Sequence, residues 1–192
     1  IIDYELIRNN IQLIKNKIPA AAKFMAIVKS NAYGHDLDIA AQALNGSVDG
    51  FGVVRLEEAI YLREKSTLPI LMMQGVYSEE DYQQLKANKI WTTIHSLAQI
   101  PDAQKYADEL TFWIKINTGM NRLGLHPSEL NQCQAFIKKG NTLMTHLACA
   151  DDPDDELNQI QFSRFHEAWK STDQDLFRSV VNSAGAINFP DQ

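Results

Sequence analysis

Short runs of apolar residues alternate with amphipathic segments along most of the chain. Continuous apolar runs are typical of strands that are buried on both faces of a parallel sheet. Such strands are expected over residues 24–28, 51–54, 70–73, 90–94, 111–116, 143–147 and 179–181. The segments between them have the apolar spacing of helices, which are predicted over residues 37–44, 56–65, 79–87, 128–139 and 156–169. Strands joined by single helices form βαβ units, so the pattern predicts an α/β fold.

The number of units indicates which α/β fold to expect. About seven strand–helix units follow one another, which favours a (β/α)8 TIM-type barrel over an open sheet. An open sheet usually has a G-x-G-x-x-G segment after its first strand, and residues 29–35 (KSNAYGH) lack it. No convincing eighth strand is found, and residues 188–192 resemble a loop. A barrel short of one strand has two unpaired edges, so we expect either that residues 1–192 are a truncated barrel domain or that another chain covers the gap.

Composition narrows the class of protein. The chain has 192 residues, of which 45% are hydrophobic and 22% charged, as is ordinary for one globular domain. The net charge of −6 argues against nucleic acid and against an acidic membrane surface as partners. No apolar run approaches the ~20 residues that span a bilayer, and the first residues do not resemble a signal peptide. Cys133 and Cys149 form no C-x-x-C motif and are expected to be free thiols, so we expect a cytoplasmic protein.

Reactive residues that directly follow predicted strands are candidates for chemistry, because barrel active sites lie at the carboxyl ends of the strands. Lys29 ends the first strand, where a desolvated amine can form a Schiff base with an aldehyde. Tyr33 follows closely and offers a phenol to a phosphate oxygen. The alternative is a lysine that merely ends a strand and extends into water.

Two further cations lie within or after the strand predicted over residues 111–116. Lys115 lies within this apolar strand, where an uncompensated charge is costly. Arg122 follows in a segment with two glycines and could bind a carboxylate or phenolate through two parallel hydrogen bonds. The alternative for Arg122 is a surface salt bridge.

The last two strands also end in polar residues. His146 could pack on a cofactor ring or donate a hydrogen bond, or it could be a structural histidine. Asn182 and Ser183 follow the seventh strand, where barrels often bind phosphate, but the segment could equally be a plain turn. Together, the candidates place an amine, a phenol, a guanidinium, an imidazole and a phosphate-type loop on one rim. That set suits an aldehyde cofactor that carries a phosphate.

No metal site is expected. The acidic run at residues 151–156 is interpreted as a solvated helix start, since the helix dipole favours acids there. His95, His126 and His166 match no metal-ligand spacing.

Several segments resemble blocks of the alanine racemase family, in family order. Residues 26–35 (AIVKSNAYGH) resemble the lysine signature that binds pyridoxal phosphate (PLP), and residues 115–124 (KINTGMNRLG) resemble a second block. Further resemblances cover residues 51–59 (FGVVRLEEA), 145–151 (THLACAD) and 182–184 (NSA). The resemblance implies the PLP-binding barrel of an enzyme that interconverts L-alanine and D-alanine and supplies D-alanine for peptidoglycan.

The resemblance also implies a role for each cofactor contact. Lys29 would hold PLP covalently and act as one of two catalytic bases. Tyr33 and Ser183, with Asn182 beside it, would bind the cofactor phosphate. His146 would pack against the pyridine ring.

Two more roles concern the substrate side. Arg122 would contact the phenolic oxygen of PLP and the substrate carboxylate. Lys115 matches a family lysine that is often carbamylated, which would give Arg122 an anionic partner.

The family pattern continues beyond what this chain contains. Family members add an eighth strand, with an arginine for the pyridine nitrogen, and a β-rich domain, whose tyrosine is the opposite-face base across a dimer interface. The resemblance therefore implies a homodimer for the intact protein and little or no activity for these 192 residues alone. The alternatives are a PLP-binding homeostasis barrel without turnover, or another PLP barrel enzyme with broader amino-acid specificity.

Overall fold

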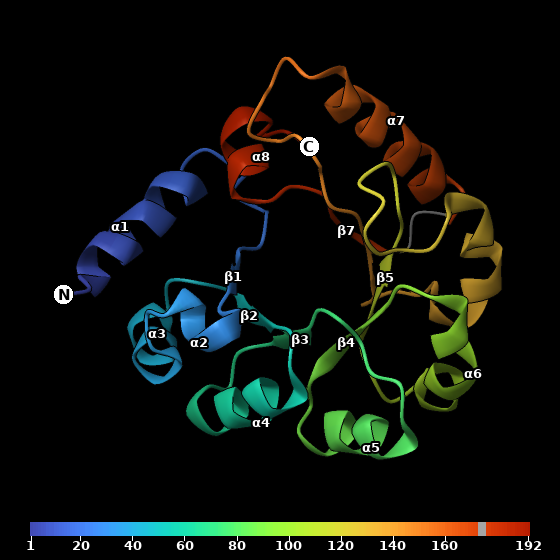
Figure 1. Ribbon diagram of the computed structural model, residues 1–192, viewed down its shortest axis with the longest axis horizontal. Coiled ribbons are helices and arrows are strands. Elements are labelled where there is room, and N and C mark those ends of the chain that lie inside the picture. Colours follow the sequence, from blue (N-terminus) through green and yellow to red (C-terminus); the bar gives the residue numbers. More distant parts are fainter. Residues whose placement is uncertain (173–175) are drawn as a thin grey trace.

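The chain folds around one parallel β-sheet whose seven strands follow their order in the sequence. The computed structural model describes residues 1–172 and 176–192 (Figure 1). The strands are β1 (Met25–Ile27), β2 (Gly50–Val53), β3 (Ile70–Met72), β4 (Trp91–Ile94), β5 (Phe112–Lys115), β6 (Thr142–Met144) and β7 (Phe177–Ser179). The sheet curls, with helices around its outside (Figure 1). The predicted incomplete (β/α)8-type barrel is confirmed, and within the described residues β1 and β7 each pair with one strand only.

Helices and short 3-10 segments connect the strands. They are α1 (Tyr4–Lys15), α2 (Lys29–Tyr33), α3 (Leu37–Leu44), α4 (Leu56–Lys65), α5 (Glu79–Ala87), η1 (Leu97–Gln99), α6 (Ile100–Ala103), η2 (Gln104–Tyr106), η3 (Pro127–Phe136), α7 (Glu156–Lys170) and α8 (Ser183–Asn188). Helices α3, α4 and α5 have the bounds that the sequence predicts. Side-chain caps define where α3 and α5 begin: Asp36 accepts the N–H of Ile39, and Ser78 accepts the N–H of Asp81.

Two connections and one strand differ from the sequence-based expectation. The predicted helix over 128–139 is the 3-10 helix η3, which ends earlier, at Phe136. The predicted strand over 179–181 lies two residues earlier as β7, because Phe177 N–H donates to the Asn141 carbonyl (2.9 Å). The connection from β4 to β5 contains η1, α6 and η2, for which the apolar spacing predicts no helix.

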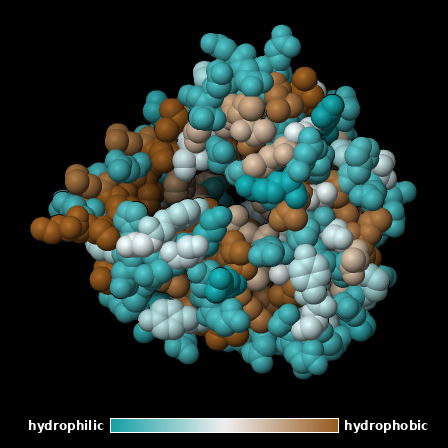
Figure 2. Space-filling model, viewed as in Figure 1, coloured by the Kyte–Doolittle hydropathy of each residue, from teal (hydrophilic) through white to brown (hydrophobic). Residues whose placement is uncertain are grey.

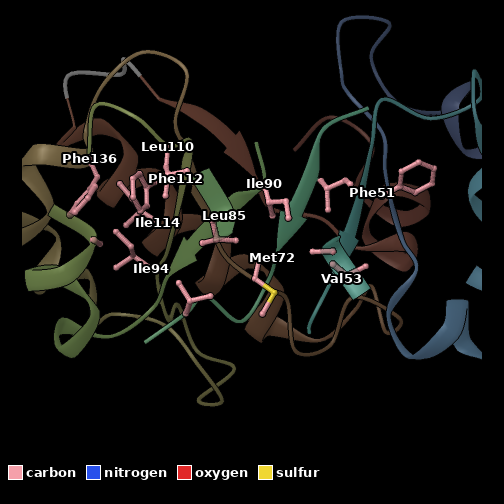
Figure 3. Packing of buried hydrophobic residues seen from close by; sticks show 14 of the residues in the cluster. Phe51, Val53, Met72, Leu85, Ile90, Ile94, Leu110, Phe112, Ile114 and Phe136 are labelled. Carbon is pink, nitrogen blue, oxygen red and sulfur yellow. The ribbon is translucent and has the colours of Figure 1, made fainter. Parts of the chain in front are cut away.

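Side chains that alternate along the strands separate a helix-facing core from the barrel interior. Phe51, Ile94, Phe112 and Ile114 are fully buried between the sheet and the helices (Figure 3). The Phe112 ring packs on the ring of Phe136 in η3, with centroids 4.8 Å apart. Burial of one such side chain contributes roughly 1.5–3 kcal/mol. This packing fixes which face of each strand points into the barrel.

Helix α1 lies on the open side of the sheet, against α3 and α8 (Figure 1). Its inner face carries Ile7, Ile11 and Ile14, and Arg8 Nη1 donates to the Ala43 carbonyl (3.3 Å). In the described part of the chain, no helix combines the length and apolar character needed to cross a membrane.

Candidate active site

The carboxyl ends of the strands carry the candidate residues towards the barrel interior. In β5, Phe112 and Ile114 face the helices, so the alternating residue Lys115 faces the interior. By the same alternation, Lys29 follows β1 and His146 follows β6 at inward-facing positions. Figure 2 shows a hollow near the centre of one face, and Figure 1, in the same view, places this point between β1 and β7.

Lys29 begins a left-handed turn. Residues 30–33 all have φ between 53° and 55°, a region that costs non-glycine residues roughly 1–2 kcal/mol each. Surrounding contacts must therefore hold the turn, and Glu58 of α4 supplies one: its Oε1 accepts the Ser30 N–H at 2.7 Å. The turn brings Tyr33 back beside the lysine, with Lys29 Nζ 5.8 Å from the ring centroid.

Arg122 lies on a closed loop after β5. Asn117 Oδ1 accepts the N–H groups of Gly119 (3.1 Å) and Asn121 (3.0 Å), which ties the loop together from within. Gly124 has φ of 132°, and a Cβ there would lie 2.6 Å from the Asn117 nitrogen, so the return to the strand requires glycine. The Arg122 side chain forms no ion pair with any acid of the described residues, which argues against the salt-bridge alternative.

The cationic candidates influence one another. Lys115 is only 7% exposed, and burial lowers its pKa, with nearby Arg122 and Lys29 adding to the effect. Burial also lowers the pKa of His146, and the charges of Lys115, Arg122 and Lys29 lower it further. Within residues 1–172 and 176–192, no acidic side chain forms an ion pair with these groups. The cluster therefore has excess positive charge and favours an anionic ligand.

The two hydroxyls that are candidates for binding phosphate belong to Tyr33 and Ser183, in the segments that follow β1 and β7. Asn182 Oδ1 accepts the N–H of Gly185 at 2.9 Å, so the segment begins helix α8 and is not a plain turn. Ser183 is exposed, and Tyr33 is 61% exposed. Both hydroxyls can therefore reach a ligand at the rim.

His95 belongs to the same rim, although its spacing suggests no role. It directly follows β4, is 7% exposed, and its Nε2 lies 2.9 Å from both the Tyr77 hydroxyl and the Gln74 carbonyl. Burial lowers its pKa, and the charge of Lys115 lowers it further. Its position after a predicted strand is the signal that identifies it.

Two helical residues that support the rim have no such signal. Glu58 of α4 bonds the Lys29 turn, and Gln161 of α7 bonds the segments after β5 and β6. Helical spacing alone marks both as polar positions. Their role follows only from the loops that they meet.

Two groups of charged residues away from the rim have local partners. Asp155 caps α7 by accepting the Leu157 N–H at 2.8 Å, which confirms the interpretation of the acidic run as a helix start. In the surface cleft between α5 and η2, Lys105 pairs with Glu79 (3.0 Å). In the part of the chain that the structure describes, no group of three His, Cys, Asp or Glu residues could hold a metal ion.

Comparison with known proteins identifies close similarity over nearly all of the chain. The sequence profile of the family described as "Alanine racemase, N-terminal domain" matches residues 2–192. The alanine racemase of Actinobacillus succinogenes is 35% identical over 194 residues, which cover 96% of this chain and 53% of that protein. The alanine racemase of Haemophilus influenzae is 37% identical, with the same coverage. The chain thus spans about half the length of the curated relatives it matches.

Solved structures agree with the sequence comparison. The alanine racemase of Acinetobacter baumannii superposes with a TM-score of 0.89 at 30% identity, over 98% of this chain and 55% of that one. The biosynthetic alanine racemase of Pseudomonas aeruginosa gives a TM-score of 0.87 at 30% identity, over 98% of this chain and 54% of that one.

Proposed function

Because the chain belongs to the family of alanine racemase N-terminal domains, we propose that it is the PLP-binding barrel of an enzyme that interconverts L-alanine and D-alanine. The observation that carries the proposal is the rim cluster of Lys29, Lys115, Arg122 and His146, which has no acidic ion-pair partner in the described chain. Formation of D-alanine for peptidoglycan, a cytoplasmic location and a homodimer of the intact protein are parts of this proposal.

The residues present fit PLP, an aldehyde that carries a phosphate and a phenolic oxygen. The amine of Lys29 would hold the aldehyde carbon. The hydroxyls of Tyr33 and Ser183, with the backbone beside Asn182, would bind the phosphate. Arg122 is suited to the phenolic oxygen, because a guanidinium donates two parallel hydrogen bonds to an anion.

Each residue would then have a distinct role. Bound PLP supplies an electron sink for the α-carbon of an amino acid. Lys29 Nζ would take the α-proton from one face, or return it to that face, as general base and acid. His146, kept neutral by burial and by neighbouring cations, would pack on the ring without adding charge. Arg122 would orient the substrate carboxylate.

Racemisation also requires a proton donor on the opposite face. A single base exchanges the proton slowly, and the proposal assigns the role of base to one rim residue, Lys29. We therefore expect the 192-residue chain to bind PLP but to form little or no D-alanine. The protein translated from the full gene is expected to be active, with alanine preferred in a panel of amino acids.

The cofactor assignment is tested by reductive trapping. The chain is mixed with PLP, reduced with borohydride, and digested for peptide mass mapping. We expect the near-ultraviolet to visible absorbance of bound PLP and a label on Lys29 that is lost in Lys29→Ala. Lys17→Ala, which alters an exposed lysine, is the control and should retain the label.

Different failures have different meanings. A label on Lys115 or another lysine would contradict the assignment to Lys29. Robust D-alanine formation by the 192 residues alone would contradict the need for a second base. PLP binding by the full gene product without turnover of any amino acid would favour a binding protein over an enzyme.

A further inference from the structure

Gln161 of α7 is fully buried, and its amide joins the segments that follow β5 and β6. Its Oε1 accepts the Ala148 N–H at 2.8 Å. Its Nε2 donates to the His146 carbonyl and to Thr118 Oγ1, both at 3.0 Å. One side chain therefore connects helix α7 to the backbone on both sides of Leu147 and to the start of the loop that carries Arg122.

Two buried hydroxyls extend this connection towards β5. Thr118 Oγ1 lies 2.7 Å from Thr145 Oγ1, and Thr145 Oγ1 donates to the Ile116 carbonyl at 3.1 Å. The Gln161 amide nitrogen can only donate, so Thr118 Oγ1 accepts from it. The Thr145 hydroxyl donates its proton to the Ile116 carbonyl, so the Thr118 hydroxyl must donate its proton to Thr145 Oγ1. The result is a directed chain of hydrogen bonds from amide to carbonyl. Such chains strengthen each member and are costly to leave half satisfied.

The chain of hydrogen bonds ends beside the proposed ligand contacts. Ile116 directly follows Lys115, Thr118 begins the segment that leads to Arg122, and Thr145 directly precedes His146. Arg164, one turn further along α7, adds a bond from its Nη1 to the Thr118 carbonyl at 2.9 Å. A glutamine that served only to hold α7 on the sheet would not need to bond both loops.

We propose that Gln161 is a positioning residue, which holds Lys115, Arg122 and His146 in the relative positions needed to contact one ligand. The proposal rests on the proposed function, because it assigns these three residues to the same PLP site. The positions of these side chains matter, since a displacement of a catalytic group by about 1 Å can lower the reaction rate roughly 100-fold. Gln161 itself is separated from the ligand by the loop backbone and acts through it.

The first test replaces the amide by a side chain of similar length that cannot form these hydrogen bonds. In Gln161→Met, we expect the 192-residue chain to bind PLP about tenfold more weakly, with a shifted absorbance maximum. In the full gene product, we expect kcat to fall about tenfold or more, with a smaller change in KM for alanine. Gln159→Met, which alters an exposed glutamine on the same helix, should match the wild type in all of these measurements.

The second test acts on the middle of the chain of hydrogen bonds and remains valid if Gln161→Met fails to fold. Thr118→Val removes the hydroxyl and keeps the shape, whereas Thr118→Ser keeps the hydroxyl. We expect Thr118→Val to reproduce the PLP and kcat defects of Gln161→Met, and Thr118→Ser to remain close to the wild type. The double variant should be little worse than either single variant, because both interrupt one network.

The outcomes separate the two proposals. If the wild type binds PLP and racemises alanine but Gln161→Met and Thr118→Val behave like Gln159→Met, the positioning role is wrong. Equal defects in Thr118→Ser and Thr118→Val would show that packing matters and the hydroxyl does not, which also overturns it. If the wild type neither binds PLP nor racemises alanine, the proposed function itself fails.

Discussion

At the scale of single residues, Lys115 is the least expected feature of the rim. It is a cation at 7% exposure with no ion-pair partner among the described residues. An unpaired buried charge is costly, and burial therefore lowers the pKa of this amine, as do nearby Arg122 and Lys29. The lower pKa increases the fraction of neutral amine, which is the form that reacts with carbon dioxide in the carbamylation that the family resemblance implies.

We predict that Lys115 forms a carbamate at a lower pH than the exposed lysines of the same chain. The amine nitrogen would bond to the carbon of carbon dioxide and release one proton, so formation requires the neutral amine. Because the pKa of Lys115 is lowered, its neutral fraction rises at lower pH than that of an exposed lysine. Carbon-13 NMR in labelled bicarbonate between pH 7 and 9 measures this. The signal should be absent in Lys115→Ala, and its persistence there would contradict the prediction.

At the scale of elements, the left-handed turn after β1 is the element that positions the backbone next to Lys29. Four consecutive non-glycine residues, 30–33, occupy a costly backbone region immediately after Lys29. The turn is held from outside: Glu58 Oε1 accepts the Ser30 N–H, and Glu58 Oε2 accepts the Arg55 N–H at 3.3 Å. The same carboxylate thus starts helix α4 and fixes the backbone next to the proposed PLP lysine.

Glu58→Gln should weaken both functions of this carboxylate, because one oxygen becomes an N–H₂ group that faces a backbone donor. We expect the free energy of unfolding to fall by roughly 1.5–3 kcal/mol, the usual contribution of a hydrogen bond to a charged group. The yield of reductive label on Lys29 should fall as well. Glu57→Gln, at the exposed neighbouring position, is the matched control in urea unfolding and PLP labelling. Equal behaviour of the two variants would show that the carboxylate does not hold the turn.

The elements also show which features a sequence can predict. Helices α3, α4 and α5 follow from apolar spacing and local caps, both of which are short-range signals. The left-handed turn does not, since Ala32 and Tyr33 disfavour positive φ. The contact that supports the turn comes from a distant residue, Glu58, which accepts the Ser30 N–H. The strand-end rule predicted Lys29, Arg122 and His146 for the rim, yet it could not indicate support from α7. Gln161 is a polar residue on a helix until the loops it bonds are known.

At the scale of the whole molecule, the positive rim cluster contrasts with the net charge of the chain. The chain has a net charge of −6, whereas Lys29, Lys115 and Arg122 gather at the strand ends without acidic ion-pair partners in the described residues. This local positive field on an acidic molecule favours small anions at the rim over extended polyanions.

The arrangement of the sheet predicts an uneven stability across the 192-residue chain. β4 and β5 have a neighbour on both sides, whereas β1 and β7 each pair on one side within the described residues, and Phe177 of β7 is 63% exposed. Alternate amides of an edge strand face away from its single partner and exchange with water more easily. In hydrogen-exchange mass spectrometry, we expect peptides over β7 and β1 to exchange well before peptides over β4 and β5, independently of protein concentration. If the protection of β1 and β7 from exchange instead rises with protein concentration, a second copy of the chain covers these edges. Pairing between copies depends on concentration, whereas pairing within one chain does not.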